Sequence, residues 1–557
     1  MKVNFTLAFL LLSVAGFSQN SFDIVYSTLN TKCSNSSCHN SAANGPNFSG
    51  AKADVYAAIV GVTPNNSAAA ARGEKYVFVN QPYESYLLKK CGSFLDTDLG
   101  LKSGDGSAMA ALGGSNLSDK EVEYMRQWIM NGAKQTGVTI DTAMVNAYYN
   151  NPNRTPFLQK PPVPANGRQL RFGPVFLPAA GQPGSEKEYL LKHKIDFGVN
   201  QEVTQLDGHM NDQSHHFLLF KFQSPQAAAN EANGIRIVQI AGAGGTVSSF
   251  DGDKDLTGAW QDDGDIRLPQ GTAIFWNSET WLDLNYHVKN YNIPSVMPCD
   301  FYLNIVTRNR PTNTPTIEMK SALVNNVGLF LQGNRSTSIY HNDQSNGRTE
   351  TRHLWMMSSH THKFGTGFTI FERDASKPNQ VGDTLYDGNY TYESNFYLGR
   401  YDWEHPSTRY FSPQRAVNMQ TNGIRARTVW NVTQTNPVTF GFTTAEEMQL
   451  FYYMYTNELA TPNGIGSIDK DNSKLSIYPN PMSESSLISI ESDENTNGQI
   501  SLVDMNGRLV YEFSANLNKG ENSFRLHNSE LNLPNGLYVL KVITSTSTME
   551  KRIMMQN

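Results

Sequence analysis

Short runs that alternate between apolar and polar residues fill the middle of the chain, and they constrain its fold more than any other feature. Between residues 166 and 460 they include LRFGPVFL, HHFLLFKF, TAIFWN, WLDLNYHV, FYLNIV, GFTIFER and PVTFGF, separated by Gly, Asn, Asp and Pro. A period of two residues is that of a strand with one buried face, and many such strands between turn residues are typical of β-sandwiches. We therefore expect two consecutive β-sandwiches, at 166–308 and 309–460.

The rest of the 557-residue chain divides around these sandwiches, because a chain of this length exceeds a single hydrophobic core. Residues 20–139 end in LSDKEVEYMRQWIMNGA, where the apolar residues recur at helical spacing and Ser118 with Glu121 predicts a capping box. We expect a small all-α domain there. The prolines of 140–165 predict a linker, 461–473 is a polar linker, and 474–557 predicts a small separate β-sandwich.

The N-terminal residues predict export. One lysine, an apolar stretch from Phe5 to Phe17 and small polar residues are typical of a cleaved signal peptide at 1–19. No other segment approaches the length needed to span a membrane. The formal net charge of -6 offers no basic surface for nucleic acid. We expect a soluble, exported protein with no nucleic-acid partner.

Cysteine and histidine meet in one motif of the expected α domain. Cys33, Cys38 and His39 form C-x4-C-H, which resembles the haem attachment site of c-type cytochromes, with a longer spacing than the usual C-x2-C-H. The resemblance implies haem c bound to both cysteines, with His39 as one iron ligand. Met109 matches the loop methionine that supplies the second ligand, although Ala110 stands where family members commonly have proline. Alternatively, Cys33 and Cys38 form a small disulfide loop. Two other cysteines, Cys91 and Cys299, either pair or remain as thiols.

Five histidines and a methionine lie in order along the two expected sandwiches. They are His215, His216, His287, His360, His362 and Met448. Imidazole and thioether groups are ligands suited to copper that cycles between Cu(II) and Cu(I). His360 and His362 share one face of a strand, whereas adjacent His215 and His216 can face one metal only at a strand end, at a bulge, or through different ring nitrogens.

This pattern resembles the copper type II, ascorbate-dependent monooxygenases, the family of peptidylglycine α-hydroxylating monooxygenase and dopamine β-monooxygenase. The likeness covers about 166–460 and rests on HHFLLF, on Tyr286-His287, on His360-Thr361-His362 with Gly365, and on Thr444 to Met448 with Met454-Tyr455. It implies an electron-storing copper on His215, His216 and His287, and a separate oxygen-activating copper on His360, His362 and Met448. It also makes Tyr452 a candidate residue of the substrate pocket.

The chain departs from this family at two positions. Ser358 stands where peptide-hydroxylating members have an arginine that holds the substrate carboxylate, and Asn285 stands where glutamine is usual. The disulfide-rich pattern of animal members is also absent. These departures argue against a peptide with a C-terminal glycine as the substrate.

The C-terminal residues resemble the type A sorting domain of the type IX secretion system of Bacteroidetes. The likeness covers 474–557 and rests on Tyr478-Pro479-Asn480-Pro481, LVDMNGRLVYE, NGLYVLKV and a final Lys551-Arg552. Such a domain is an export address read by the secretion machinery. A plain carbohydrate-binding sandwich is the alternative, but no exposed aromatic platform is evident.

Together these features predict a secreted cytochrome–copper monooxygenase. Hydroxylation of a C–H bond with O2 needs two external electrons, which we expect the haem domain to deliver singly, in place of or beside a donor such as ascorbate. The substrate is not indicated. Two other interpretations stay open: a non-catalytic copper and haem redox or metal-binding protein, and a surface adhesin in which C-x4-C-H is only a disulfide loop.

Overall fold

The computed structural model describes residues 20–34, 39–41, 45–93, 95–109, 117–238, 252–344, 349–374, 376–392, 396–460, 474–482, 484–504, 508–531, 533–544 and 548–555. The expected signal peptide, Cys38, Ala110 and the linker at 461–473 lie outside these residues. The chain divides into two compact units, Met1–Ala460 and Thr461–Asn557. None of the helices in the described part is long and apolar enough to span a membrane.

The first unit begins with a helical region, as the sequence predicts. It contains α1 (Ser21–Cys33), α2 (Lys52–Ile59), α3 (Ser67–Ala71), α4 (Tyr86–Gly92), α5 (Asp119–Met130) and α6 (Thr142–Asn150), with short 3₁₀ turns η2 (Pro82–Glu84) and η3 (Thr97–Leu99). The predicted capping box is confirmed, because the Ser118 side chain accepts from the Glu121 N–H and the Glu121 side chain bonds back to the Ser118 N–H. Trp128 stacks on Phe22 in the buried core.

Helix α6 corrects the prediction that residues 140–165 form only a linker. Asp141 caps it by accepting a hydrogen bond from the Met144 N–H, and it ends at Asn150, before the first proline of the segment. Val145 and Tyr148 are buried, and the helix packs on α5. Only the later, proline-containing part of the segment lacks regular structure.

The first sandwich consists of two sheets. One has the order β1-β10-β3-β8-β11, with β7 also paired to β3; its strands are β1 (Gly167–Leu177), β3 (Gln201–Met210), β7 (Gly264–Arg267), β8 (Thr272–Trp276), β10 (Met297–Asn309) and β11 (Ile317–Glu318). The other has the order β5-β2-β9-β4-β6, from β2 (Glu186–Asp196), β4 (Ser214–Phe222), β5 (Arg236–Ile237), β6 (Lys254–Trp260) and β9 (Glu279–Lys289), with α7 (Pro225–Asn230) beside it. This sandwich extends beyond the expected boundary at 308, because β11 pairs with β8.

The second sandwich also has two sheets. One runs β12-β23-β15-β20, from β12 (Lys320–Asn325), β15 (Thr351–His360), β20 (Arg409–Asn418) and β23 (Leu450–Thr456). The other runs β14-β21-β16-β17, from β14 (Arg335–Gln344), β16 (Gly365–Arg373), β17 (Val381–Asp387) and β21 (Ile424–Val432). Short ribbons join β13 (Phe330–Leu331) to β22 (Val438–Thr439) and β18 (Tyr390–Thr391) to β19 (Phe396–Tyr397), and η5 (Pro378–Gln380) precedes β17.

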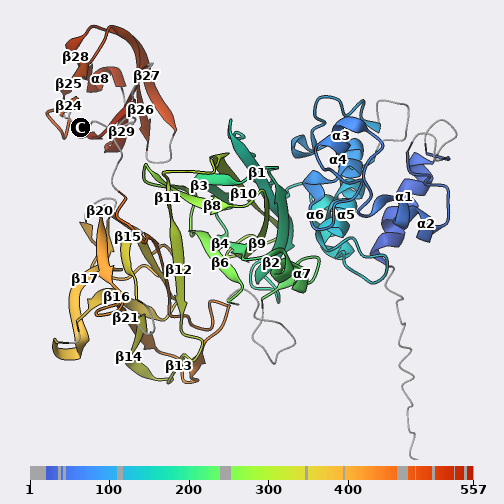
Figure 1. The fold of residues 1–557 in the computed structure, drawn as a ribbon, viewed down its shortest axis with the longest axis horizontal. Helices are drawn as coiled ribbons and strands as arrows, with labels where there is room; N and C mark the ends of the chain where they lie inside the picture. Colours follow the sequence, from blue (N-terminus) through green and yellow to red (C-terminus); the bar gives the residue numbers. More distant parts are fainter. Residues whose placement is uncertain are drawn as a thin grey trace, which may run out of the picture. The chain divides into compact units, whose positions relative to one another are not determined.

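The three parts of the first unit contact one another through named side chains. Leu218 and Leu256 of the first sandwich pack with Leu323 and Tyr452 of the second. In Figure 1 the helices gather on the side of the first sandwich that carries β1, which α6 contacts. Arg171 of β1 pairs there with Asp98 at 2.6 Å, and both side chains are nearly inaccessible to solvent.

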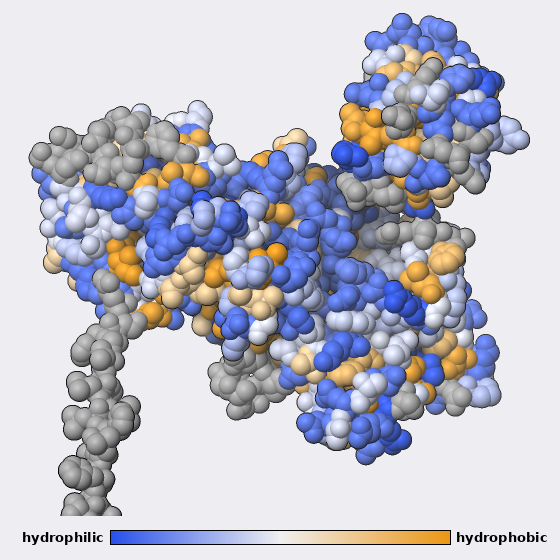
Figure 2. Space-filling model, turned by 180° about the vertical axis from the view of Figure 1, so that it is seen from behind, coloured by the Kyte–Doolittle hydropathy of each residue, from blue (hydrophilic) through white to orange (hydrophobic). Residues whose placement is uncertain are grey.

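The second unit is a small β-sandwich, as the sequence predicts. Its sheets run β24-β25-β28 and β27-β26-β29-β30, from β24 (Leu475–Tyr478), β25 (Ser485–Ser492), β26 (Thr496–Asp504), β27 (Leu509–Leu517), β28 (Gly520–His527), β29 (Gly536–Ile543) and β30 (Thr548–Met555), with α8 (Asn528–Leu531) after β28. Ile488, Leu502 and Leu540 lie in its buried core. On the faces visible in Figure 2, hydrophobic residues form small patches between hydrophilic ones. The chain is thus a β-rich protein of several sandwiches preceded by helices.

Candidate functional site

The five histidines singled out in the sequence lie together in one cluster. The ring centroids of His215 and His287 are 4.8 Å apart, those of His216 and His360 are 5.3 Å apart, and those of His360 and His362 are 5.1 Å apart. None of the five residues is more than 5% exposed. The sequence predicts two separate metal sites. The structure places both sets of histidines in one buried cluster between the sandwiches.

Local strand geometry places the first three histidines on one face. His216 lies directly opposite His287 in the pairing of β4 with β9, and the register shifts between Ser214 and His216. This irregularity allows the adjacent residues His215 and His216 both to face the cluster. A bulge is one of the arrangements that the sequence predicts for two neighbouring histidines. The Tyr286 hydroxyl lies 2.7 Å from the Ser214 hydroxyl and anchors the same region of the two strands.

A tight turn and a buried carboxylate position the other two histidines. Strand β15 ends at His360, and Gly365 begins β16 where an added Cβ would lie 2.0 Å from Thr361 Oγ1. Glu447 accepts hydrogen bonds from the backbone N–H groups of His362 at 3.0 Å and Phe364 at 2.7 Å, and from Trp430 Nε1 at 2.9 Å. Burial raises the pKa of Glu447 to about 7, while these donors favour its charged form. Glu447 therefore fixes the turn that presents His362.

Each of three histidines uses one ring nitrogen to bond with its surroundings. His287 Nε2 lies 3.1 Å from Glu186 Oε1, His362 Nδ1 lies 3.1 Å from the Glu446 carbonyl, and His360 Nδ1 lies 3.0 Å from the Gln261 amide. Such partners fix the orientation and tautomer of a metal-binding imidazole. If His360 offers the lone pair of Nε2, its Nδ1 carries the proton and needs an acceptor. The Gln261 amide oxygen can be that acceptor after the amide group turns over by itself.

The remaining nitrogens point to a ligand. Among the residues that the structure describes, these buried ring atoms have no hydrogen-bond partner: His215 Nε2, His216 Nδ1 and Nε2, His287 Nδ1, His360 Nε2 and His362 Nε2. Buried polar atoms without partners are rare because each costs free energy. Six such atoms on five histidines of one cluster are an arrangement that metal ions would satisfy.

Burial keeps four of the five imidazoles neutral. Desolvation, followed by the charges of neighbouring histidines, holds the pKa values of His215, His287 and His360 well below the ordinary value. Desolvation likewise lowers the pKa of His362 to about 4. A neutral imidazole has a lone pair on one nitrogen, which is the form that binds metals. These four imidazoles therefore have the protonation state that metal binding requires.

The donor atoms form two overlapping triads. His215, His216 and His360 make one, and Glu188, His216 and His287 make the other, with the donor atoms of each triad within 4.8 Å of one another. His216 belongs to both. The sequence does not indicate Glu186 and Glu188, because nothing in the EKEY segment shows which strand will lie beside it. It does not indicate Gln261 either, because this residue reaches His360 from the other sandwich.

Two further predicted residues, Met448 and Tyr452, lie just before and within β23. Met448 is 2% exposed, and its backbone N–H donates to Glu447 Oε2, the same oxygen that accepts from the His362 N–H. Tyr452 pairs with Ser358 between β23 and β15, and its hydroxyl donates to the Ala259 carbonyl across the sandwich interface at 3.4 Å. The Asn285 amide donates to Glu188 Oε1 at 2.8 Å. Trp403 also lies beside His215, with ring centroids 6.0 Å apart.

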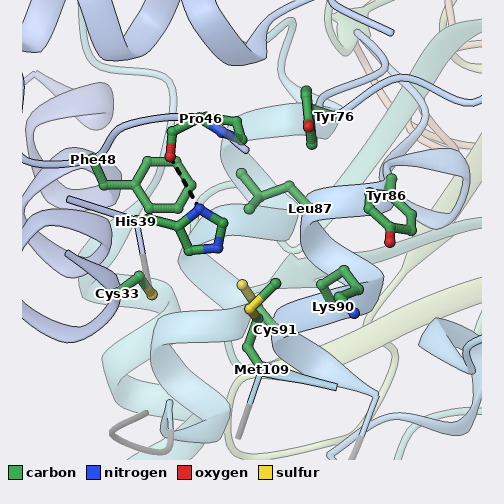
Figure 3. A pocket seen from close by; sticks show the side chains of 10 residues that line it. All are labelled: Cys33, His39, Pro46, Phe48, Tyr76, Tyr86, Leu87, Lys90, Cys91 and Met109. Carbon is green, nitrogen blue, oxygen red and sulfur yellow. Dashed lines mark hydrogen bonds between the residues drawn. The ribbon is translucent and has the colours of Figure 1, made fainter. Parts of the chain in front are cut away.

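A second candidate site lies in the helical region. Cys33, His39 and Met109 line one small pocket with Phe48, Tyr76, Leu87 and other largely apolar groups. Figure 3 shows the His39 ring bonded to the Pro46 carbonyl, 3.0 Å from Nδ1, with its other nitrogen directed into the pocket. Gly45, at φ +120°, leaves room for this ring, since an added Cβ would lie 3.3 Å from its Cε1. The structure thus brings together every described residue predicted to bind haem.

Of the two alternatives for Cys91 and Cys299, the described residues show unpaired thiols. Cys91 and Cys299 are both free and buried, and they belong to different hydrophobic cores. Cys91 instead lines the same pocket as Cys33, and a hydrogen bond between these two thiols lowers the pKa of Cys33 and raises that of Cys91. Cys91 is therefore a third sulfur in the pocket that the sequence did not indicate.

Comparison with known proteins identifies the C-terminal unit. Residues 476–556 match the family described as the secretion system C-terminal sorting domain. This match confirms the predicted sorting domain of type IX secretion and indicates export, to the medium or the cell surface, in a Bacteroidetes-like bacterium. The secretion machinery is accordingly a partner of this unit.

The other comparisons give no family for the remaining 476 residues. No curated protein matches the chain. Among solved structures, similarities include the β-glucuronidase of Parabacteroides merdae (9% identity, 40% of this chain, 29% of that chain, TM-score 0.12) and the β-glucuronidase of Ruminococcus gnavus (9%, 45%, 40%, 0.12). A biofilm-associated protein BSP domain has 9% identity, with 68% of this chain and 83% of that chain covered, at a TM-score of 0.13. The chain covers well under half the length of both β-glucuronidases.

Proposed function

We propose that this protein is an exported copper-dependent monooxygenase. The observation that carries the proposal is the cluster of five buried histidines whose unpartnered nitrogens converge between two sandwiches. A bound pair of copper ions would supply two one-electron steps and a position for O2, and hydroxylation of a C–H bond would release the second oxygen atom as water. The protein would be an oxidoreductase whose substrate is not defined by the cluster itself.

The residues around the cluster suit this role. Glu186 and Gln261 would orient His287 and His360, and Glu447 would hold His362 and the backbone of Met448 in place. Burial would exclude water from the reacting atoms, which limits side reactions. We assign His360, His362 and Met448 to oxygen activation and His215, His216 and His287 to electron storage, with Tyr452 beside the substrate.

We further propose that the helical region binds haem c and supplies the electrons. His39 would offer Nε2 to the iron because its Nδ1 bonds to Pro46, and Met109 would be the second ligand. Cys33 would be one thioether attachment, together with Cys38. Ascorbate or another small reductant would serve as the initial donor.

Contacts between the helical region and the first sandwich support electron delivery within one chain. Arg171 of β1 lies 2.6 Å from Asp98 and 2.9 Å from Asp300, and all three side chains are at most 7% exposed. The Gln81 side chain also exchanges two hydrogen bonds with the backbone of Lys194. These contacts would hold the two redox sites in a constant relation, so that electron transfer needs no encounter between separate proteins.

Stopped-flow kinetics of protein reduced without O2 would test this function. The full chain, made in a strain that matures c-type cytochromes, is reduced at the haem and mixed with O2 with and without bound copper. We expect haem reoxidation to be faster with copper, and the increase to be lost in His360→Ala. Equal haem kinetics with and without copper would contradict electron transfer between the sites.

The complete burial of the cluster favours one alternative, a non-catalytic redox or copper-binding protein. The two functions differ in the effect of Met448→Ala. In the monooxygenase, this variant loses reductant-driven O2 consumption. If the protein only binds copper, Met448→Ala weakens copper binding, and O2 consumption is at background in both the unmodified protein and the variant. Measuring both quantities on one preparation separates the two functions.

A further inference from the structure

A carboxylate lies in the histidine cluster beside the three histidines expected to store electrons. Glu188 of β2 stands directly opposite His287 of β9, and His287 stands directly opposite His216 of β4. Residues opposite one another on neighbouring strands point to the same face of a sheet. Glu188, His287 and His216 therefore form a row across three adjacent strands, all facing the second sandwich.

The surroundings of Glu188 leave its charge without a protein cation. The residue is 4% exposed, and within the described residues its Oε2 atom is buried with no hydrogen-bond partner. Its Oε1 atom accepts from the Asn285 amide, which is neutral. Within the described part of the chain, the only ion-pair contact of Glu188 is with His216. A buried carboxylate paired with neither lysine nor arginine is costly unless another cation neutralises it.

The distance between Glu188 and His216 fits a shared metal ion better than a hydrogen bond. Glu188 Oε1 and His216 Nε2 are 3.5 Å apart. Nitrogen–oxygen hydrogen bonds cluster at about 2.7–3.2 Å. Two ligands that each lie about 2.1 Å from one ion, at a tetrahedral angle, are about 3.4 Å apart. The remaining donor, His287, offers Nδ1, which has no partner among the described residues because Nε2 faces Glu186.

We propose that Glu188 is a metal ligand, completing a two-histidine, one-carboxylate triad with His216 and His287. This inference rests on the proposed function and adds an anionic oxygen to the three-histidine set implied by the family resemblance. A hard anionic donor favours a divalent first-row ion over Cu(I), and the same donor set suits Fe(II) when positions remain open. Glu188 thus stabilises the oxidised form of the electron-storing site.

Glu188→Gln tests the proposal, because the amide keeps the shape of the side chain and removes its charge. The copper-loaded full chain is compared with the variant by Cu(II) competition titration, by the Cu(II) electron paramagnetic resonance spectrum and by the Cu(II)/Cu(I) potential. We expect the affinity of one site to fall about tenfold or more, the spectrum of that site to change, and its potential to rise. A parallel titration with Fe(II), made without O2, should lose the same site.

Two further variants separate a ligand from a structural residue. Glu188→Asp keeps the charge on a shorter side chain, so it should recover part of the Cu(II) affinity that Glu188→Gln loses. Glu202→Gln is the matched control, because Glu202 is a buried carboxylate on β3, in the other sheet of the same sandwich, bonded to Arg308 at 2.6 Å. It should leave the Cu(II) spectrum unchanged even if it lowers stability.

The outcomes distinguish this proposal from the proposed function. If the unmodified protein binds no copper, the monooxygenase proposal fails, and with it the assignment of Glu188. If the unmodified protein binds two coppers and Glu188→Gln has the same affinity, spectrum and potential, only Glu188 as a ligand is overturned.

Discussion

At the scale of single residues, His216 has the most connected position in the cluster. It belongs to both triads, and both of its ring nitrogens are buried without partners among the described residues. His287 and His360 each belong to one triad. A histidine in this position can serve two metal ions or decide between them, so its removal should be more damaging than that of its neighbours.

We predict that His216→Ala loses more copper than either His287→Ala or His360→Ala. The physical reason is that one substitution removes a donor from both triads, whereas each of the others affects one. Copper per chain, measured after loading with excess copper and desalting, checks this. Equal losses in all three variants would show that His216 serves a single ion.

His193, outside the cluster, gives a prediction about pH. Burial lowers its pKa from 6.5 to about 4. Between these values the unfolded chain binds a proton that the folded chain does not, so stability rises with pH across this window and falls as the pH is lowered. Because of His193, the free energy of unfolding should be about 3 kcal/mol lower at pH 4 than at pH 7. In His193→Gln this part of the pH dependence should disappear.

Urea unfolding of unmodified protein and His193→Gln, at several values between pH 4 and pH 7, measures the effect. The difference in unfolding free energy between the two proteins should shift in favour of the variant as the pH falls. Parallel curves over the whole range would mean that His193 is accessible to protons in the folded state.

Sequence reasoning could find the histidines and Met448 because their types and order are visible in one dimension. It could not find Glu188, whose place depends on the register of β2 against β9, or Gln261, which reaches His360 from the other sandwich. For the same reason it could not show that two sets of histidines, about 75 residues or more apart in the chain, form one cluster.

At the scale of elements, the turn between β15 and β16 depends on Glu447. Its carboxylate accepts from four N–H groups, those of His362, Phe364, Met448 and the Trp430 ring. It therefore joins the end of β15, strand β21 and the start of β23. Elements that carry metal ligands need such support, because small displacements of a ligand weaken binding.

We predict that Glu447→Gln destabilises the first unit by about 2–4 kcal/mol, because an amide NH2 would face donors that need an acceptor. Metal binding at His362 should weaken as well. Glu446→Gln is the control, since in the described part of the chain the Glu446 side chain bonds only to exposed Thr443, and its carbonyl contact with His362 is unaffected. Chemical denaturation gives the first quantity and copper titration the second. Equal stability of the two variants would refute the role assigned to Glu447.

The strands were more predictable than the boundaries between elements. Short apolar runs between turn residues predict the strands that carry the histidines, although β4 and β9 are buried along almost their whole length rather than at alternate residues. The capping box predicts the start of α5. The sequence does not predict helix α6, because the prolines after residue 151 favour a linker over the whole of 140–165. Asp141 is nevertheless a good N-cap. The 317–318 strand was missed because only two residues pair with β8.

At the scale of the whole molecule, the division into two units predicts that the C-terminal unit is dispensable for the metal centre. Deletion of residues 461–557 should leave copper content, the haem spectrum and the thermal unfolding of the first unit unchanged, because that unit has its own cores. Transfer to the cell surface or the medium should be abolished, since the sorting domain is lost, whereas the signal peptide expected at 1–19 should still direct the chain into the periplasm. Fractionation of producing cells and calorimetry check both parts. Loss of metal on truncation would contradict the independence of the first unit.

The central claim is that the five histidines form one metal centre rather than two distant ones. Electron paramagnetic resonance of the fully Cu(II)-loaded full chain, with copper counted in the same sample, tests it most directly. We predict two coppers per chain whose spectrum shows magnetic coupling between neighbouring ions, and an uncoupled single-ion spectrum in His360→Ala. Two coppers that give the sum of isolated Cu(II) spectra would contradict a single centre, and a chain without copper would contradict the metal assignment altogether.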